Sequence, residues 1–270
     1  NGRDFGRLLS SVIIPAGQQS VLITVTPTND AEVEGSETLS VTLETNTAPF
    51  RLVVIPDTRA SVAQIGGGMR AMLESQTKWI SSQADALKIG FVLHTGDITE
   101  SNSGSEWALA QAQLQLAVPF ALVPGDHDGL NGVVAQTSGF NASFPAAAAR
   151  NRPEFGGLFE SNKLDNAYYY FSAGGLDWLI LAIEFMPRDD VLDWANRVVA
   201  AHPQRKVIIL THAFLAEDDS VPTSAENGRE NAPAEVWEKL LRRHANIAFV
   251  FSGHTEGDGV ARRMDLGDYG

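Results

Sequence analysis

From residue 50 onward, short apolar segments alternate with segments of helical periodicity, and this alternation limits the possible folds more than any other feature. Residues 52–55 and 120–123 are continuous apolar runs that are each followed by a proline, as expected of buried strands. Between them, residues 69–87 carry apolar side chains at helical spacing. The alternation predicts an α/β domain with a mainly parallel sheet and helices outside it. In such folds, ligands bind beyond the carboxyl ends of the strands.

Further segments continue this pattern along the chain. Residues 173–175 (Ala-Gly-Gly) separate two strands that we expect to pair, the first edge-like and the second deeply buried. The span 130–166 lacks periodicity and is predicted to be irregular, either as an excursion over a site or as a mobile loop. Tryptophans on helical faces are expected in the core, namely Trp79, Trp107, Trp194 and Trp237. The other elements are expected as strands at 91–93, 168–171, 178–185, 207–210, 247–251 and 260–266, and as helices at 105–118, 189–202 and 233–244.

An Asp or a His follows each of five predicted strands. One of these turns, residues 125–129, presents three ionisable side chains in succession, which alone could be a solvated acidic turn. The carboxyl ends of parallel strands meet at one edge of a sheet, so all five turns would converge. In three turns a glycine allows a sharp bend and a close approach to a ligand. The residues concerned are Asp57, Asp97, Asp126, His127, Asp128, His212 and His254.

These candidate ligands are carboxylates and imidazoles, without thiolates, because the chain has no cysteine. Such a set suits two hard-to-borderline cations of the manganese, iron or zinc type. Two ions about 3.5–4 Å apart could hold a bridging hydroxide and clamp both oxygens of an in-line phosphoryl displacement. His94, inside one of the strands, is expected either as a satisfied core histidine or as a support for the site.

In chain order the turns read D-x-R, G-D, G-D-H-D, an isolated H and G-H-x-E. This order resembles the calcineurin-like metallophosphoesterase family, whose blocks are D-x-H or D-x-Q, G-D, G-N-H-D/E, H and G-H-x-H. The resemblance covers a predicted domain at residues 49–270. It implies an α/β fold, a β-sandwich of two mixed sheets flanked by helices, and hydrolysis of a phosphomonoester or a phosphodiester.

The resemblance also implies a role for each residue. His127, oriented by Asp128, would stabilise the transition state or protonate the leaving oxygen. Asp57 and Asp97 would contribute to one metal ion. The other ion would be held by Asp97, Asp126, His212 and His254.

Three positions depart from the family pattern. Asp126 stands in place of asparagine, which adds negative charge to a site that should still bind metal. Arg59 stands where the family has His or Gln, and a guanidinium is a poor metal ligand. Glu256 replaces the second His of the last block. Either Glu256 or Asp258 supplies an oxygen ligand, or Arg59 grips the substrate phosphate as a bidentate fork. The third alternative is a domain that holds one metal ion and is weakly active or inactive.

The first 48 residues are predicted to be all-β. Residues 14–43 alternate apolar and polar side chains and resemble the second half of a Calx-β domain, an immunoglobulin-like sandwich repeated in cell-surface and secreted proteins. The acidic cluster at residues 30–37 could bind calcium or could be a solvated loop. We therefore expect a partial Calx-β segment at 1–48, further domains in a longer parent chain, and an extracellular, cell-surface or periplasmic location.

The charge composition narrows the class of partner. The chain has 33 acidic and 20 basic residues and a net charge of −13, which opposes non-specific binding to nucleic acid. Its apolar runs are too short to span a membrane. We expect a metal-dependent phosphoesterase acting on a phosphate ester. The alternative class is a cell-surface binding or adhesion module whose phosphoesterase fold has lost catalysis.

Overall fold

The computed structural model describes residues 49–63, 69–130, 136–255, 262–265 and 267–268. The predicted Calx-β segment, including its acidic cluster at residues 30–37, lies outside these residues, as do Glu256 and Asp258. In the part of the chain that is described, no helix is both long and apolar enough to cross a bilayer.

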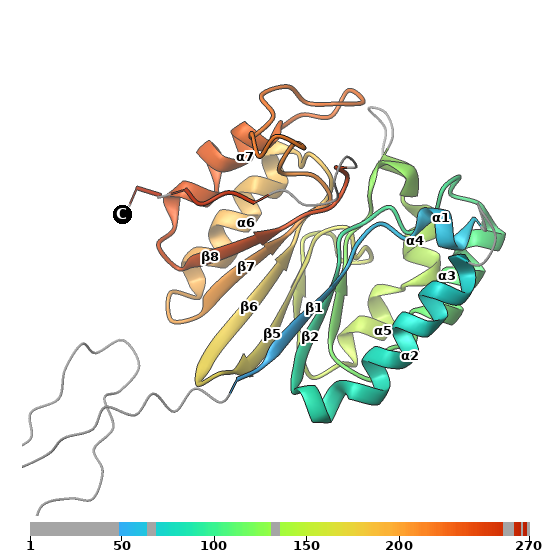
Figure 1. Cartoon of the computed structure of the whole chain (residues 1–270). Helices are drawn as coiled ribbons and strands as arrows, with labels where there is room; N and C mark the ends of the chain where they lie inside the picture. Colours follow the sequence, from blue (N-terminus) through green and yellow to red (C-terminus); the bar gives the residue numbers. More distant parts are fainter. Residues whose placement is uncertain (1–48, 64–68, 131–135, 256–261, 266, 269–270) are drawn as a thin grey trace, which may run out of the picture. The chain divides into compact units, whose positions relative to one another are not determined.

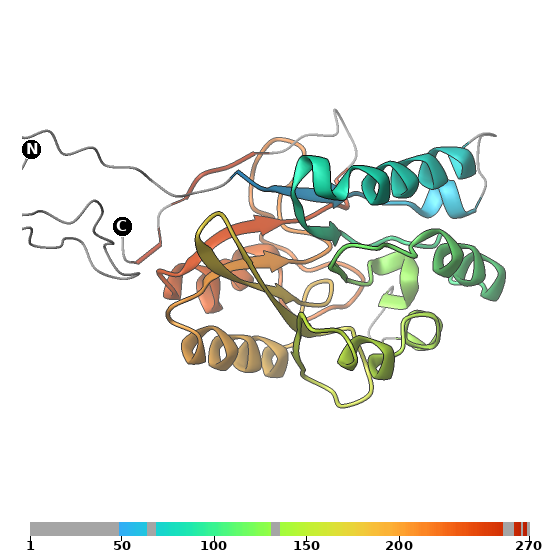
Figure 2. The same ribbon diagram turned by 90° about the horizontal axis from the view of Figure 1, so that it is seen from below.

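Two β-sheets pack face to face between two layers of helices (Figures 1 and 2). The first sheet, β1-β2-β3, is entirely parallel, so the expectation of two mixed sheets is wrong for it. The reason is that helices connect its strands, and a helical crossover returns the chain in the same direction. The second sheet, β4-β5-β6-β7-β8, is antiparallel from β4 to β6 and parallel from β6 to β8. The strands are β1 (Arg51–Ile55), β2 (Ile89–His94), β3 (Phe120–Leu122), β4 (Phe155–Leu158), β5 (Ala167–Ala173), β6 (Leu176–Ala182), β7 (Lys206–Leu210) and β8 (Ile247–Phe251).

The helices form one group beside each sheet. Helices α1 to α5 accompany the first sheet, and α6 and α7 accompany the second (Figure 1). They are α1 (Arg59–Val62), α2 (Met69–Leu87), α3 (Gly104–Gln113), α4 (Ser138–Ser143), α5 (Ala146–Arg150), α6 (Asp189–Ala201) and α7 (Pro233–Lys239), with two short helical turns, η1 (Asp126–Leu130) and η2 (Leu241–Arg243).

Strand β6 shows how the core is divided. Its residues Ile180 and Ala182 face the first sheet, whereas Leu179 and Leu181 pack on the side of α6. Both faces of the strand are covered, which is why its sequence is a continuous apolar run rather than an alternating one. The two sheets contact each other through aromatic rings, among them Phe91 of β2 and Phe171 of β5, whose centroids lie 5.3 Å apart.

Several predicted elements need correction. The span 130–166 contains α4, α5 and β4, which are too short to produce a readable periodicity. Since β4 pairs with β5, the latter is not an edge strand. Trp107 is buried as expected, but Trp79 is 51% exposed, because the apolar stripe of α2 is wider than the surface that covers it. Residues 262–265 do not form the expected last strand.

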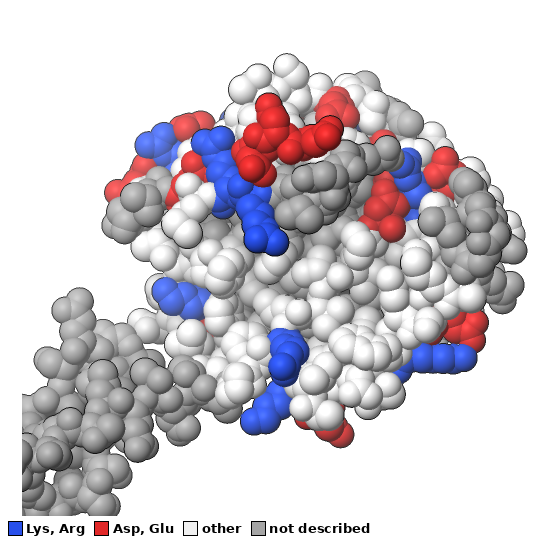
Figure 3. All heavy atoms as spheres, viewed as in Figure 1, with Lys and Arg blue, Asp and Glu red and all other residues white. Residues whose placement is uncertain are grey.

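The five strands that precede the candidate ligands finish at one end of the molecule. In the first sheet Ile55 of β1 pairs with His94 of β2, which pairs with Leu122 of β3. In the second sheet Leu210 of β7 pairs with Phe251 of β8. The acidic side chains visible in Figure 3 lie mostly in the upper half of that view, towards the end where these strands finish. The topology thus brings the predicted turns together.

Candidate metal centre

Asp126, His212 and His254 converge at the ends of β3, β7 and β8. Their ligand atoms lie within 4.8 Å of one another and form the group that could hold a metal ion among the residues described. Asp126 Oδ1 is 3.2 Å from His212 Nε2 and 3.4 Å from His254 Nδ1. The two inward ring nitrogens, His212 Nε2 and His254 Nδ1, are 3.1 Å apart. All three residues had been predicted as ligands of one ion.

The outer ring nitrogens of the two histidines determine what the inner nitrogens can do. His212 Nδ1 lies 2.8 Å from the carbonyl oxygen of Thr95, and His254 Nε2 lies 3.3 Å from Glu226 Oε2. Both partners are acceptors, so in the neutral form of each ring the outer nitrogen carries the proton and the inner nitrogen offers a lone pair. Two nitrogen lone pairs and one carboxylate oxygen therefore point at a common position. This donor set fits a divalent cation of the zinc, iron or manganese type.

The charge state of Asp126 agrees with this arrangement. Burial opposes its ionisation, but hydrogen bonds from His212 and His254, which form when the inner nitrogens carry protons, outweigh that effect and hold the pKa of Asp126 well below its usual range. A metal ion would displace those protons. The hydrogen bond to Asp126 in turn raises the pKa of His254. Asp126 is therefore an anion, as a ligand must be.

Asp97 lies beside this group and almost entirely in the interior, with 2% of its surface exposed. Its Oδ1 is 3.4 Å from His212 Nε2. Burial raises the pKa of Asp97 to about 7, and the neighbouring charges of Asp126 and Asp57 act in the same direction, against the lowering effect of His212. A carboxylate in such a place is stable as an anion when a cation is near it.

The turns that hold these side chains require glycine. A Cβ atom on Gly125 would lie 2.1 Å from Asp97 Oδ1, and one on Gly96 would lie 2.7 Å from His212 Nδ1. Asp97 and His254 themselves have positive φ angles of 49° and 68°. Non-glycine residues adopt this conformation rarely, and aspartate and histidine are among the types that tolerate it best. Glycine at these strand ends thus allows the turns themselves to approach one another closely.

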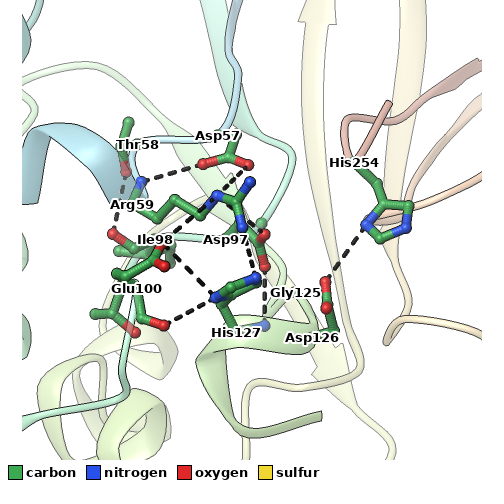
Figure 4. A network of polar contacts seen from close by, with 12 residues as sticks. Asp57, Thr58, Arg59, Asp97, Ile98, Glu100, Gly125, Asp126, His127 and His254 are labelled. Carbon is green, nitrogen blue, oxygen red and sulfur yellow. Dashed lines mark hydrogen bonds and ion pairs between the residues drawn. The ribbon is translucent and has the colours of Figure 1, made fainter. Parts of the chain in front are cut away.

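Asp57 does not join the three-residue group and instead holds Arg59 (Figure 4). Asp57 Oδ1 accepts a hydrogen bond of 3.1 Å from the Arg59 backbone N–H, and Oδ2 is 3.3 Å from Arg59 Nε. Arg59 Nε also lies 3.9 Å from Asp97 Oδ2 and 3.7 Å from Glu100 Oε2. Burial raises the pKa of Asp57, and the charge of Arg59 opposes that rise. A guanidinium therefore lies among three carboxylates.

His127 sits between Arg59 and the loop that follows β2. Its Nδ1 donates to the carbonyl oxygen of Glu100 at 2.8 Å, and its Nε2 accepts from Arg59 Nη1 at 2.5 Å. Its backbone N–H donates to Asp97 Oδ1 at 3.1 Å. The imidazole is therefore neutral in this contact, with its proton on Nδ1.

Asp128 does not orient His127, contrary to expectation. Its carboxylate is completely buried and accepts hydrogen bonds from the backbone N–H groups of Ile98, Thr99 and Gly125, at 2.8, 2.7 and 3.0 Å. The Thr99 hydroxyl donates to it at 2.9 Å. These groups surround the carboxylate because η1 turns it towards the interior. Asp128 thus ties the loop after β2 to the loop after β3, and the Glu100 carbonyl orients His127.

His94 is a satisfied core histidine, as one of the two alternatives predicted. Its Nδ1 accepts from the Gly96 N–H at 3.2 Å, and its Nε2 donates to Thr58 Oγ1 at 3.1 Å. Burial lowers its pKa to about 3, with a smaller contribution from His212. His94 supports the turn that carries Asp97.

Sequence reasoning did not identify Glu100, Thr95 or Glu226. Glu100 and Thr95 act on the histidines through backbone carbonyls, which no side-chain pattern reveals. Glu226 lies in a segment without helix or strand and reaches His254 across 28 residues of sequence. The acidic character of that segment was the available signal, but it is shared by many solvated loops.

Comparison with known proteins gives three kinds of match. The family model for calcineurin-like phosphoesterases matches residues 50–256. The uncharacterised protein YvnB of Bacillus subtilis (strain 168) is 24% identical over 192 residues, which are 68% of this chain and 14% of that protein. A Staphylococcus aureus structure with a provisional 5′-nucleotidase assignment, in complex with α-ketoglutarate, matches with a TM-score of 0.45 and 14% identity over 75% of this chain and 44% of that one. GAP50, the anchor in the inner membrane complex of Plasmodium, matches with a TM-score of 0.35 and 12% identity over 63% of this chain and 56% of that one.

Proposed function

The chain belongs to the calcineurin-like phosphoesterase family, and from that premise we propose that it is a metal-dependent hydrolase of phosphomonoesters or phosphodiesters. The observation that carries the proposal is the convergence of Asp126, His212 and His254 on one position, beside the buried Asp97. A divalent ion bound there would withdraw charge from a phosphoryl group and lower the pKa of water.

The residues of the chain would bind and orient the ester next to this position. Arg59 presents a planar set of N–H donors that suits two oxygens of a phosphoryl group. The side chain of Arg59 is 23% exposed and that of His127 is 28% exposed, so solvent reaches both. A phosphoryl group held by Arg59 would therefore lie within reach of His127.

His127 is the proposed proton donor to the leaving oxygen. Burial lowers its pKa, but the hydrogen bond to Glu100 and the charge of Asp97 outweigh burial and raise the pKa above its usual value. The positive charge of Arg59 opposes this rise, and its Nη1 lies against Nε2 of the ring. When Arg59 donates to a phosphoryl oxygen instead, His127 Nε2 becomes free to carry the proton that a general acid needs.

The experiment is an assay of p-nitrophenyl phosphate and bis-p-nitrophenyl phosphate with manganese, zinc and iron, before and after chelation. We expect turnover of at least one ester that chelation abolishes and that Asp97→Asn reduces by two orders of magnitude or more. Asp85→Asn, on an exposed position of α2, is the matched control and should leave turnover unchanged. The proposal fails if the metal-loaded chain hydrolyses neither ester, or if Asp97→Asn is as active as the unaltered chain.

A second function is favoured by one observation, the pairing of Arg59 with Asp57 and Asp97 where the family resemblance implied a second metal ion. This pairing would suit a binding or adhesion module that has lost catalysis. The same assay separates the two functions, because a binding module would turn over neither ester with any metal.

A further inference from the structure

We propose that the guanidinium of Arg59 replaces a second metal ion, so that the centre is built for one metal ion and one fixed organic cation. The inference deepens the proposed function and rests on it only for the identity of the substrate. Its starting point is the position of Arg59, which lies near the carboxylates of Asp57, Asp97 and Glu100 at Nε–O distances of 3.3, 3.9 and 3.7 Å.

Asp97 links the two halves of the centre. One of its oxygens, Oδ1, faces His212 Nε2 at 3.4 Å. His212 belongs to the proposed metal-binding group, which consists of Asp126, His212 and His254. The other, Oδ2, faces the Arg59 guanidinium at 3.9 Å. A single buried carboxylate is thus shared between the metal-binding group and the guanidinium (Figure 4). A carboxylate shared by two cations would take this position, and here the Arg59 guanidinium is one of the two cations.

Asp57 anchors the arginine rather than a metal ion. One carboxylate oxygen binds the Arg59 backbone N–H and the other faces its side-chain Nε, so Asp57 holds both ends of the residue. An ion bound to Asp57 and Asp97 would need to lie about 2.1 Å from an oxygen of each. The guanidinium lies between these oxygens and excludes an ion from that region.

The chemical consequence is a second positive charge that does not depend on metal supply. An arginine side chain stays protonated at every physiological pH and cannot serve as a metal ligand. Its planar fork binds two phosphoryl oxygens at once, whereas a metal ion binds through open coordination positions. We therefore expect the centre to recognise a phosphate group through one metal ion and Arg59.

Metal stoichiometry tests the inference without a catalytic readout. The full chain is loaded with manganese, passed through gel filtration and analysed by plasma emission, with calorimetric titration as a second measurement. We expect one manganese ion per chain for the unaltered protein and two for Arg59→His, since an imidazole at this position adds a nitrogen ligand to Asp57 and Asp97. Arg150→His, an exposed arginine in α5, is the matched control and should bind one ion.

Two further variants keep the inference testable if Arg59→His does not fold, which circular dichroism would reveal. Arg59→Lys retains the charge and should bind one ion, and Asp57→Asn should also keep one ion, because Asp57 is not a ligand in the arginine-filled centre. Two ions in the unaltered chain, one ion in folded Arg59→His, or loss of the ion in Asp57→Asn would overturn the inference. A chain that binds one ion but hydrolyses neither ester would refute the proposed function and leave the inference standing.

Discussion

Replacing Asp128 by alanine is expected to destabilise the protein strongly, because this carboxylate holds two loops rather than His127. Its side chain accepts four hydrogen bonds, three of them from backbone N–H groups, and none of its surface is exposed. Removal of the carboxylate leaves those donors buried without a partner. Each such donor costs about 1–3 kcal/mol, and water that enters the space recovers part of that cost.

The expected loss is therefore about 4 kcal/mol in the free energy of unfolding, well above the ~1 kcal/mol of an average substitution. The assay is urea denaturation at pH 7, followed by circular dichroism, in the presence of chelator so that metal binding does not contribute. Asp85→Ala on the exposed face of α2 is the matched control and should change the free energy by less than about 0.5 kcal/mol.

The two possible roles of Asp128 make opposite predictions. If Asp128 orients His127, Asp128→Ala lowers turnover and leaves the unfolding free energy almost unchanged. If it ties the loops together, the main effect is on stability. A loss below about 1 kcal/mol in the urea experiment would refute the assignment made from its hydrogen bonds.

Three further predictions concern the ligands and the fold. Gly125→Ala should lower manganese affinity at least tenfold in calorimetric titration, because the added Cβ would lie 2.1 Å from Asp97 Oδ1. Glu226→Gln should weaken metal binding about tenfold in the same titration, since the partner of His254 Nε2 loses its charge. Burial raises the pKa of Asp165 from 3.8 to about 6, so its contribution to stability is present below pH 4 and is lost as pH rises through 6. Between pH 4 and pH 7, Asp165→Asn should therefore gain about 2–3 kcal/mol relative to the unaltered chain in urea denaturation.

Each of these predictions has a control of the same chemical type. Gly104→Ala places its Cβ where no atom lies within 4 Å and should not affect metal affinity. Glu217→Gln changes an exposed acid of the same segment as Glu226 and should leave binding unchanged. Asp85→Asn should show no pH-dependent gain. Equal affinities in Gly125→Ala and Gly104→Ala, equal affinities in the two glutamine variants, or a constant difference for Asp165→Asn would each contradict the corresponding prediction.

The sequence was sufficient to predict the strand ends and the ligand types that follow them. Helix α2 begins and ends where the periodicity predicted, and the paired strands β5 and β6 flank the predicted turn. These elements have long or continuous apolar patterns, which sequence reasoning reads well. His212 and His254 could be predicted because an isolated imidazole directly after a buried strand has few other reasons to be there.

What the sequence could not supply is the direction in which neighbouring side chains point. Asp126, His127 and Asp128 are consecutive, yet Asp126 faces the His212 and His254 rings, His127 faces the Arg59 guanidinium, and Asp128 faces the interior. The backbone of η1 decides these directions, and its geometry depends on the loop after β2, far away in the sequence. Distant segments also decide which helical side chains are covered, since Trp107 is buried whereas Trp79 is exposed.

The charged groups of the centre illustrate what the sequence alone does not reveal. The sequence shows that Asp57, Asp97 and Asp126 meet at strand ends, and three close carboxylates require cations. It does not show which cation lies beside which carboxylate. The motif D-x-R differs from D-x-H by one side chain, and the fold determines which carboxylates that side chain contacts. In the structure Asp126 faces two imidazole nitrogens, which suit a metal ion, whereas Asp57 faces a guanidinium, which does not. Asp97 lies between them and faces both, so its ionisation depends on the two sides together. A change in either cation should therefore alter the affinity for the other. We expect manganese affinity at the Asp126 group to rise when Arg59 is replaced by a neutral residue such as glutamine. The reason is that Asp97 then interacts with one cation only.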